Sequence, residues 1–537
     1  MLMKQGENVC ISLYQREYGG SISPYRRNLK IFRKLVLQKD AKFKKMFEKH
    51  SGYPITFERD RLYLNQHRIC YAIHGHGGIP QKIYELPSCP VSQKIVEPLV
   101  MDHAYLDELP LLHNGYKPSF LALTAHNWLM RYDLDTGEEL QRVYLSTFCK
   151  FRRILPETEC ERFTLKSVHQ KNSRLGASSL NVLMTIALFT IFPLEFTGML
   201  EIEKKIFGKD ITDVMLSHSL LLIMHQRGKI SIHSLEEVLA NGKLYTAKLG
   251  QFIPDHGIVG SAGVGLPINI KLKECPAVLF EVKCADHNLQ MGGNPWHYII
   301  SPHGHSGVFK TYALKDDQLA KNGVLESSIY SVEAERAIFH PDDSGRILHI
   351  IAHEIKIYSI KEDALDGFYS IKNCFSIYAS GRDAYTDTTA EPETVTTSSG
   401  RVVRRQIYRA DEVECDYDLV VLFHFQSIQG IDYENELDIL AVTAVNQHGD
   451  ACQGMVRFHD NANGALLKEI VLDEPWNQFH DHVIGVDMDT VVHIVKGPMK
   501  KFSCYIYKLD RSGATEKVAP RKKSRSRSSR PVPRSGR

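Results

Sequence analysis

The sequence lacks the paired cysteine motifs of disulfide scaffolds and zinc sites. Its eleven cysteines are scattered over 537 residues, and none forms a CxxC pair. An odd number of scattered cysteines excludes a disulfide framework and a zinc knuckle. It indicates a reducing compartment, in which most thiols are small buried apolar groups. A signal peptide is not expected either, because the opening residues MLMKQGENVC contain no apolar core segment.

Catalytic motifs are also missing. The sequence contains no GxSxG, no phosphate-loop lysine motif, no HExxH and no kinase signature. The glycine run at 257–265 is followed by Pro267 and an alternating segment, whereas a dinucleotide site needs a helix there. Three His-x-His pairs, at 74/76, 303/305 and 480/482, have no third ligand at motif spacing. We therefore expect a protein that is not an enzyme, with no catalytic residues, no cofactor and no metal.

Only one long apolar run occurs, and it has two interpretations. Leu175–Leu194, LGASSLNVLMTIALFTIFPL, carries no charge and is long enough to span a bilayer. Its Ser, Thr and Asn residues lower the hydropathy, however, and the following EFTGMLEI alternates as a strand does. We favour strands buried in a blade, and a membrane-associated protein that spans at 175–194 is the alternative.

Alternating apolar and polar residues dominate the segment from Phe120 to Leu145, FLALTAHNWLMRYDLDTGEELQRVYL. Alternation at period two buries one face of a strand, and turns are indicated at 126–127 and 135–138. Gly137 supplies the backbone freedom of a tight turn, and Asp135 is expected to bond to the backbone within it. Three short strands cannot bury their apolar face alone, so this hairpin predicts copies of itself beside it.

Copies of the hairpin recur along the chain. A strand that ends in an apolar–aromatic–x–apolar pattern and precedes a polar turn occurs around His233, Tyr312, Tyr358, His459 and Tyr507. A unit of about 40 to 50 residues, the WD-repeat length, fits their spacing if the longer steps each contain a divergent copy. We predict an all-β fold: a single degenerate WD-repeat-like β-propeller of seven or eight blades over residues 53–511. Within it, residues 381–405 are predicted to be a disordered loop.

Two basic segments flank the predicted propeller. After a loose N-terminus (1–24), residues 25–52 are predicted to be a basic amphipathic helical segment, with an apolar stripe at helical spacing. The stripe consists of Leu29, Phe32, Leu35, Val36, Phe43, Met46 and Phe47. Such a helix packs on the body, docks on a partner or lies on a membrane surface.

The second basic segment, 512–537, is predicted to be a disordered tail. Between Ala514 and Arg537 nine Lys or Arg residues stand against one Glu. The densest group is Arg521, Lys522, Lys523, Arg525, Arg527 and Arg530. This group suits nuclear targeting, or electrostatic binding of phosphates in a nucleolar RNA-binding scaffold. Base stacking is not expected, because the tail has no aromatic residue.

Several blocks of the sequence together resemble one family. They are TAHNWLMR (124–131), LEIEKKIFG (200–208), GGNPWHYIISP (292–302), LAKNG (319–323), FHPDDSGRILHI (339–350), SGRVVRR (399–405), DYENELDIL (432–440) and FSCYIY (502–507). The family is that of the cullin-4-associated factors, and the resemblance runs from about residue 8 to residue 507. It implies a non-catalytic, WD-repeat-like substrate receptor of a cullin-4 RING ubiquitin ligase, located in the nucleus and nucleolus.

The resemblance also implies a docking site for the ligase's damage-specific DNA-binding adaptor protein. Receptors of this type use an N-terminal helical segment and a Trp-Asp-x-Arg motif, of which Trp128 and Arg131 match here while Leu129 replaces Asp. The predicted adaptor-binding residues are Leu29, Phe32, Leu35, Val36, Trp128 and Arg131. The other expected partner is a protein substrate, whose identity the sequence does not give.

Overall fold

The fold was determined as a computed structural model, which describes residues 22–510 with gaps. The longer gaps are 102–118, 169–180, 327–335 and 380–425, and only 393–396 and 402–405 are described within the last. Residues 1–21 of the predicted loose N-terminus (1–24) and the whole predicted basic tail (512–537) lie outside the described residues, whereas residues 22–24 belong to a helix.

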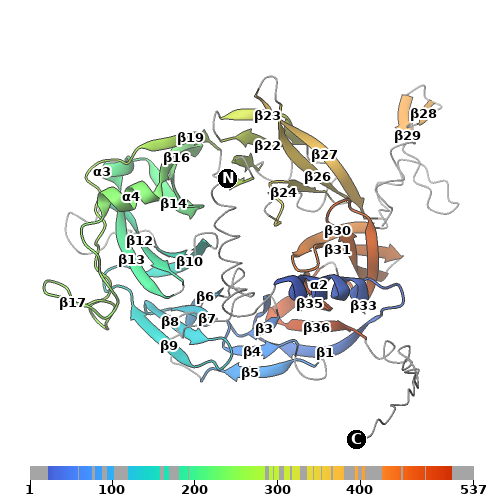
Figure 1. The fold of residues 1–537 in the computed structure, drawn as a ribbon, viewed down its shortest axis with the longest axis horizontal. Helices are drawn as coiled ribbons and strands as arrows, with labels where there is room; N and C mark the ends of the chain where they lie inside the picture. Colours follow the sequence, from blue (N-terminus) through green and yellow to red (C-terminus); the bar gives the residue numbers. More distant parts are fainter. Residues whose placement is uncertain are drawn as a thin grey trace, which may run out of the picture.

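Eight blades of four strands each follow one another round a closed ring (Figure 1). Among the described residues, six blades are separate antiparallel sheets and the other two are joined in one eight-stranded sheet. The first blade is β2 (Ile55–Glu58), β3 (Arg61–Leu64), β4 (Ile69–Ala72) and β5 (Gln81–Glu85). The second is β6 (Ile95–Met101), β7 (Ser119–Thr124), β8 (Trp128–Asp133) and β9 (Glu139–Tyr144). The third is β10 (Phe151–Glu157), β11 (Arg162–Ser167), β12 (Val182–Thr190) and β13 (Glu195–Glu203). The fourth is β14 (Ile211–Ser217), β15 (Leu220–His225), β16 (Lys229–Ser234) and β19 (Val278–Lys283).

The fifth and sixth blades share one parallel bridge, between Lys321 and Ser370. The fifth is β20 (Leu289–Gly292), β21 (His297–Ile300), β22 (Val308–Ala313) and β23 (Gln318–Glu326). The sixth is β24 (Arg336–Phe339), β25 (Ile347–Ile350), β26 (Glu354–Glu362) and β27 (Tyr369–Tyr378). The seventh is β30 (Gln426–Glu434), β31 (Ile439–His448), β32 (Ala451–Asp460) and β33 (Leu466–Pro475). The eighth is β34 (Asp481–Asp487), β35 (Thr490–Lys496), β36 (Phe502–Leu509) and β1 (Phe43–Ser51).

The two ends of the chain close the ring together. Strand β1 pairs antiparallel with β36, with Phe43 opposite Leu509 and Ser51 opposite Phe502. An N-terminal strand therefore completes the last blade, whose other strands come from the C-terminal end. Without β1, the last blade would have only three strands and β36 would be its unpaired edge.

The hydrophobic core is divided among the seams between neighbouring blades. The described residues form eight buried clusters, each with members from two adjacent blades. In the seam between the second and third blades, for example, Leu121 packs with Phe163 and Phe189. One cluster joins the eighth blade to the first, through Ile506 and Leu62. Every seam is thus filled, and the ring has no open joint.

The remaining described elements are short or lie outside the blades. The helices are α2 (Ile22–Val36), α3 (Lys204–Phe207) and α4 (Leu235–Gly242), with 3-10 turns at Gln226–Gly228 and Pro498–Lys500. The small hairpin β17 (Phe252–Ile253) and β18 (Gly257–Ile258) belongs to a connection between α4 and β19. A second hairpin, β28 (Glu393–Thr396) and β29 (Val402–Arg405), extends from the ring at the upper right of Figure 1.

The propeller prediction is confirmed, with eight blades. The three strands predicted from Phe120 to Leu145 are β7, β8 and β9. The turn between β8 and β9 differs from the prediction in the residue whose side chain bonds to the backbone. The Asp133 carboxylate, not Asp135, accepts the backbone N–H groups of the turn, at 2.8 and 3.0 Å, while Asp135 accepts from Arg61. Gly137 adopts φ 72° there, as expected of the glycine.

Three other predictions need correction or are only partly tested. The segment around His233 continues into α4 instead of a hairpin turn, because Ser234 caps the helix by accepting the N–H of Glu237. The predicted disordered loop 381–405 contains β28 and β29; its other residues lie outside the described part of the chain. Within Leu175–Leu194, residues 182–190 form the buried strand β12, as favoured. Among the described residues, the structure contains no helix with the length and apolar character needed to cross a membrane.

The predicted helical segment 25–52 is wrong in its second half. Helix α2 ends at Val36, and residues 43–51 form β1. Phe43 and Phe47 are four residues apart, a spacing that suits one face of a helix. In β1, however, a bulge between Lys45 and Phe47 lets Phe43 pack in the seam between the seventh and eighth blades and Phe47 in the seam between the eighth and first. Pairing with β36, far away in the sequence, selects the strand.

Candidate partner-docking site

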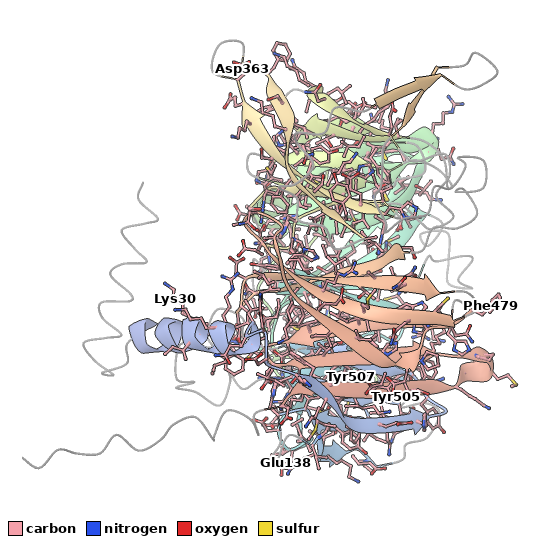
Figure 2. All side chains as sticks on the ribbon, turned by 90° about the vertical axis from the view of Figure 1, so that its right-hand side faces the viewer. Lys30, Glu138, Asp363, Phe479, Tyr505 and Tyr507 are labelled. Atoms are coloured by element: carbon pink, nitrogen blue, oxygen red, sulfur yellow. The ribbon has the colours of Figure 1, made fainter. Side chains whose placement is uncertain are left out.

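Helix α2 projects from one flat side of the ring. In Figure 2, Lys30 on this helix stands clear of the blades, whereas Phe479 lies at the opposite side of the molecule. Figure 1 shows the same helix in front of the seventh and eighth blades. The described part of the helix, residues 29–36, therefore stands out from the ring and is held at its C-terminal end.

Three contacts hold the C-terminal end of α2 on the ring. Val36 is fully buried in the seam between the seventh and eighth blades, and Phe32 packs against the same cluster. Arg33 forms a salt bridge of 2.8 Å with Asp460, in the turn after β32. Just after the helix, Lys468 Nζ donates to the carbonyl oxygens of Gln38 and Ala41, at 2.9 and 2.5 Å. Burial lowers the pKa of Lys468, but it donates two hydrogen bonds in compensation.

The outward side of α2 carries exposed apolar residues between basic ones. Ile31 is 53% exposed and Leu35 is 41% exposed. They are four residues apart and so lie on one side of the helix. Lys30 and Lys34 beside them are exposed as well. An apolar strip with basic neighbours on a projecting helix matches the way an amphipathic helix enters a hydrophobic groove of a partner.

The residues of the predicted apolar stripe on α2 thus face two ways, some towards the ring and some towards solvent. Val36 is fully buried in the ring, where its side chain anchors the helix, and its assignment to adaptor binding stays a prediction. Phe32 is half-buried against the same cluster, Leu29 is half-buried, and Leu35 is exposed. The sequence prediction missed Ile31, although its spacing of four from Leu35 was a signal that could have identified it.

Trp128 and Arg131 both lie within β8, in the second blade. Trp128 is half-buried, packs against Tyr144 with ring centroids 5.2 Å apart, and lies under the Arg142 guanidinium. Arg131 is only 6% exposed, and its Nε donates to Ser119 Oγ at 2.8 Å. Burial lowers the pKa of Arg131, and Asp133 partly opposes this. Arg131 is thus almost completely buried in the blade, and the predicted contacts of Arg131 and Trp128 with the adaptor stay predictions.

The predicted nuclear-targeting residues, Arg521 to Arg530, lie outside the described residues. Their role stays a prediction.

Comparison with known proteins identifies relatives over nearly the whole chain. The family model described as DDB1- and CUL4-associated factor 17 matches residues 27–509. The chain is 37% identical over 517 residues to a protein of that name from Mus musculus, covering 94% of this chain and 96% of the relative. It is also 37% identical over 528 residues to the Danio rerio protein of that name, covering 96% and 97%.

Among solved structures, the C-terminal WD40 domain of Sif2 is similar, with a TM-score of 0.38 and 8% identity. The similarity covers 86% of this chain and 98% of that domain.

Proposed function

Because the chain belongs to the family of DDB1- and CUL4-associated factor 17, we propose that it is a non-catalytic substrate receptor. In this role it bridges the damage-specific DNA-binding adaptor protein of a cullin-4 RING ubiquitin ligase to proteins that become ubiquitinated. The relatives' name supports association with the adaptor and the cullin. The bridging role adds a second binding partner, so that transfer of ubiquitin gains from proximity.

The observation that carries the proposal is the exposed apolar side of α2. Ile31 and Leu35 are left uncovered on a helix that is anchored at one end and stands away from the ring. The rest of the ring is closed by its own pairing and packing. A rigid ring with one projecting amphipathic helix suits a scaffold, because the helix engages one protein while the blades remain free for another.

Native co-purification of the adaptor from cells tests this proposal. We expect the double variant Ile31→Asp/Leu35→Asp to lose most of the adaptor, since two charges would enter an apolar groove. Val483→Asp is the matched control, because Val483 is 59% exposed on β34 and undergoes the same chemical change. Undiminished recovery with the double variant removes α2 as the docking element. An equal loss of adaptor with Val483→Asp would show that the effect is not specific to this side of α2.

We also propose that the chain is located in the nucleus and nucleolus, supported by the basic group from Arg521 to Arg530 in the sequence. A fluorescent fusion from which residues 511–537 are deleted should lose nuclear accumulation. Retained accumulation would exclude the tail as the import signal.

A further inference from the structure

We propose that a pocket at the outer edge of the second and third blades binds a partner segment that carries a Lys or Arg side chain flanked by apolar residues. This inference rests on the proposed receptor function and names the class of segment it would recognise. The pocket lies between these blades and residues 243–277, here called the rim insertion, which connects α4 to β19.

The rim insertion leaves the fourth blade and runs back along the edge of the third. Ile270 forms a parallel bridge with Leu200 in β13, the last strand of the third blade, and its N–H donates to Met199 O at 3.1 Å. The Asn269 side chain links the two layers: Oδ1 accepts the Met199 N–H at 2.9 Å, and Nδ2 donates to Tyr245 O at 3.0 Å. Asn269 is fully buried, so this link is shielded from water.

A second set of bonds fixes the insertion to the second blade. The N–H of Leu266 donates to Leu145 O at 2.9 Å, and the N–H of Tyr144 donates to Gly260 O at 2.8 Å. Gly265 adopts φ 83°, and a Cβ there would stand 2.9 Å from Leu145 O. The insertion therefore forms one wall of the pocket and is hydrogen-bonded to both blades.

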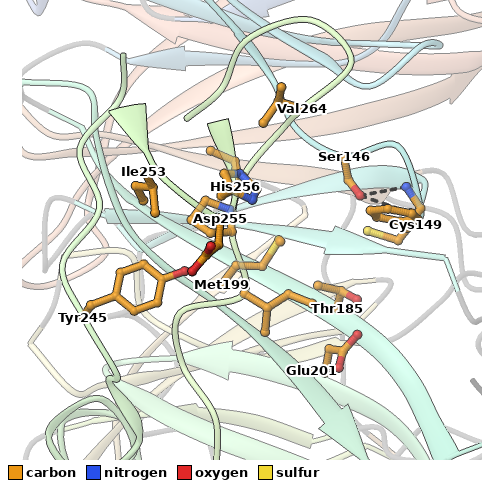
Figure 3. A pocket seen from close by; sticks show the side chains of 14 residues that line it. Ser146, Cys149, Thr185, Met199, Glu201, Tyr245, Ile253, Asp255, His256 and Val264 are labelled. Atoms are coloured by element: carbon orange, nitrogen blue, oxygen red, sulfur yellow. Dashed lines mark hydrogen bonds between the residues drawn. The ribbon is translucent and has the colours of Figure 1, made fainter. Parts of the chain in front are cut away.

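The pocket between these walls has a volume of about 490 Å³, which lies in the range of ligand sites. Figure 3 shows Tyr245 and Asp255 of the insertion on one side and Met199, Thr185 and Glu201 of the third blade on the other. Leu266 and Pro267, both buried, also line it. The interior is thus mainly apolar with a few polar groups, which is typical of a site that fixes the orientation of what it binds.

The charge of the lining is of one sign. Glu201 and Asp255 contribute carboxylates, and no Lys or Arg is among the described lining residues. Neither carboxylate forms a salt bridge within the described part of the chain. Burial raises the pKa of Glu201, the neighbouring Glu203 adds to this, and Lys271 opposes it. A cationic group placed in the pocket would meet carboxylates with no Lys or Arg beside them in the described lining, and its charge would offset the desolvation of Glu201.

Exposed apolar side chains near the mouth favour a polypeptide segment over a small cation. Phe148, which lines the pocket, is 79% exposed, and Ile268 is 42% exposed. Exposed apolar groups gathered at one place mark interaction surfaces. A bound segment would put its basic side chain in the pocket and cover these residues with its apolar neighbours.

Selection from a random peptide library, displayed on phage, tests the inference on the purified full-length chain. The comparison variant is Glu201→Gln/Asp255→Asn, which removes both charges at nearly constant shape. The matched control is Glu195→Gln, because Glu195 is exposed on the same strand β13 and does not line the pocket. Peptides enriched on the wild type over the double variant should combine Lys or Arg with Leu, Met or Phe. Labelled versions should bind the double variant about tenfold or more weakly, and Glu195→Gln as the wild type.

Three results overturn the proposal. One is an equal enrichment on the wild type and the double variant, and another is enrichment of acidic or purely apolar peptides. The third is enrichment only after residues 511–537 are deleted, because the chain's own basic tail would then be the occupant. Adaptor co-purification is measured on the same variants and should be unchanged. Undiminished adaptor recovery with Ile31→Asp/Leu35→Asp therefore contradicts docking through α2, whereas equal peptide enrichment on the wild type and the pocket variant contradicts only this inference.

Discussion

At the residue scale, one turn recurs between the last two strands of three blades. In each, an Asp is followed four residues later by a Gly at positive φ: Asp133 and Gly137, Asp363 and Gly367, Asp460 and Gly464. The Gly N–H donates to the Asp carbonyl oxygen, and the Asp N–H donates to the residue after the Gly. This shared turn is a stronger repeat signature than the aromatic pattern. The spacing is visible in the sequence, but it is recognised only once the strands are aligned.

Two of these glycines allow a matched test. A Cβ on Gly137 would stand 2.7 Å from Tyr84, whereas a Cβ on Gly367 meets nothing within 4 Å. We expect Gly367→Ala to lower the free energy of unfolding by about 1 kcal/mol, because alanine is strained at a positive φ. Gly137→Ala should lower the free energy of unfolding by roughly 1–3 kcal/mol more, because the methyl group also crowds Tyr84. Thermal unfolding of the two variants checks this. Equal melting temperatures would show that the seam tolerates the methyl group.

Aromatic rings pack against one another in the eighth blade, and the protonation of one of them, His493, affects the stability of the fold. His493 lies between His482, with ring centroids 5.2 Å apart, and Tyr505, at 5.8 Å. The His482 Nδ1 and His493 Nε2 atoms share a hydrogen bond of 2.9 Å. Burial lowers the pKa of His493 to about 3, with a contribution from His482. His493 is therefore neutral in the folded protein at a pH where the unfolded chain binds a proton.

The sign of the pH effect follows from these protonation states. Above about pH 6.5 His493 is neutral in both states, so its contribution to stability is constant. As the pH falls from there towards 3, the unfolded state gains a proton and the fold loses stability, by about 2 kcal/mol at pH 5. Glu434, whose pKa burial raises to about 7, acts in the opposite direction.

His493→Gln isolates this term, because Glu434 affects both proteins equally. We expect the melting temperature of the variant, measured by scanning fluorimetry, to fall less between pH 7.5 and pH 5 than that of the wild type. An equal loss would contradict a neutral buried His493.

At the scale of elements, local pattern determined the strands of the second blade but not the N-terminal segment. Ser119–Tyr144 forms its three strands beside each other, so alternation and turn residues were sufficient. In contrast, residues 43–51 pair with β36 at the far end of the chain, which no local pattern shows. The division of α2 into Val36, which is buried, and Leu35, which is exposed, likewise depends on the blades beneath the helix.

Deletions that separate α2 from β1 test the closing role of the strand. Removal of residues 1–42 keeps β1 and should leave a folded ring with a modestly lower melting temperature, because Val36 leaves its cluster. Removal of residues 1–51 also exposes the edge of β36 and should cause aggregation or a far larger loss of stability. Size-exclusion chromatography and thermal unfolding distinguish these results. Similar behaviour of the two deletions would exclude β1 as the closing strand.

At the scale of the whole molecule, the architecture was predictable, whereas its sites were not. Repeated hairpins indicate a propeller, because each blade needs a neighbour to bury its face. The blade count required the pairing of β1 with β36. The pocket joins residues from the second blade, the third blade and the rim insertion, so its members are scattered in the sequence and share no motif. The ring thus holds α2 and the pocket on separate parts of a single rigid body.

Hydrogen exchange of the purified chain, with and without the adaptor, tests this account most directly. The account predicts that adaptor binding slows backbone exchange in residues 22–36 and leaves residues 243–277 unchanged, because the helix docks and the pocket stays free. Unchanged exchange in α2 of the bound chain, with protection elsewhere on the ring, would contradict it.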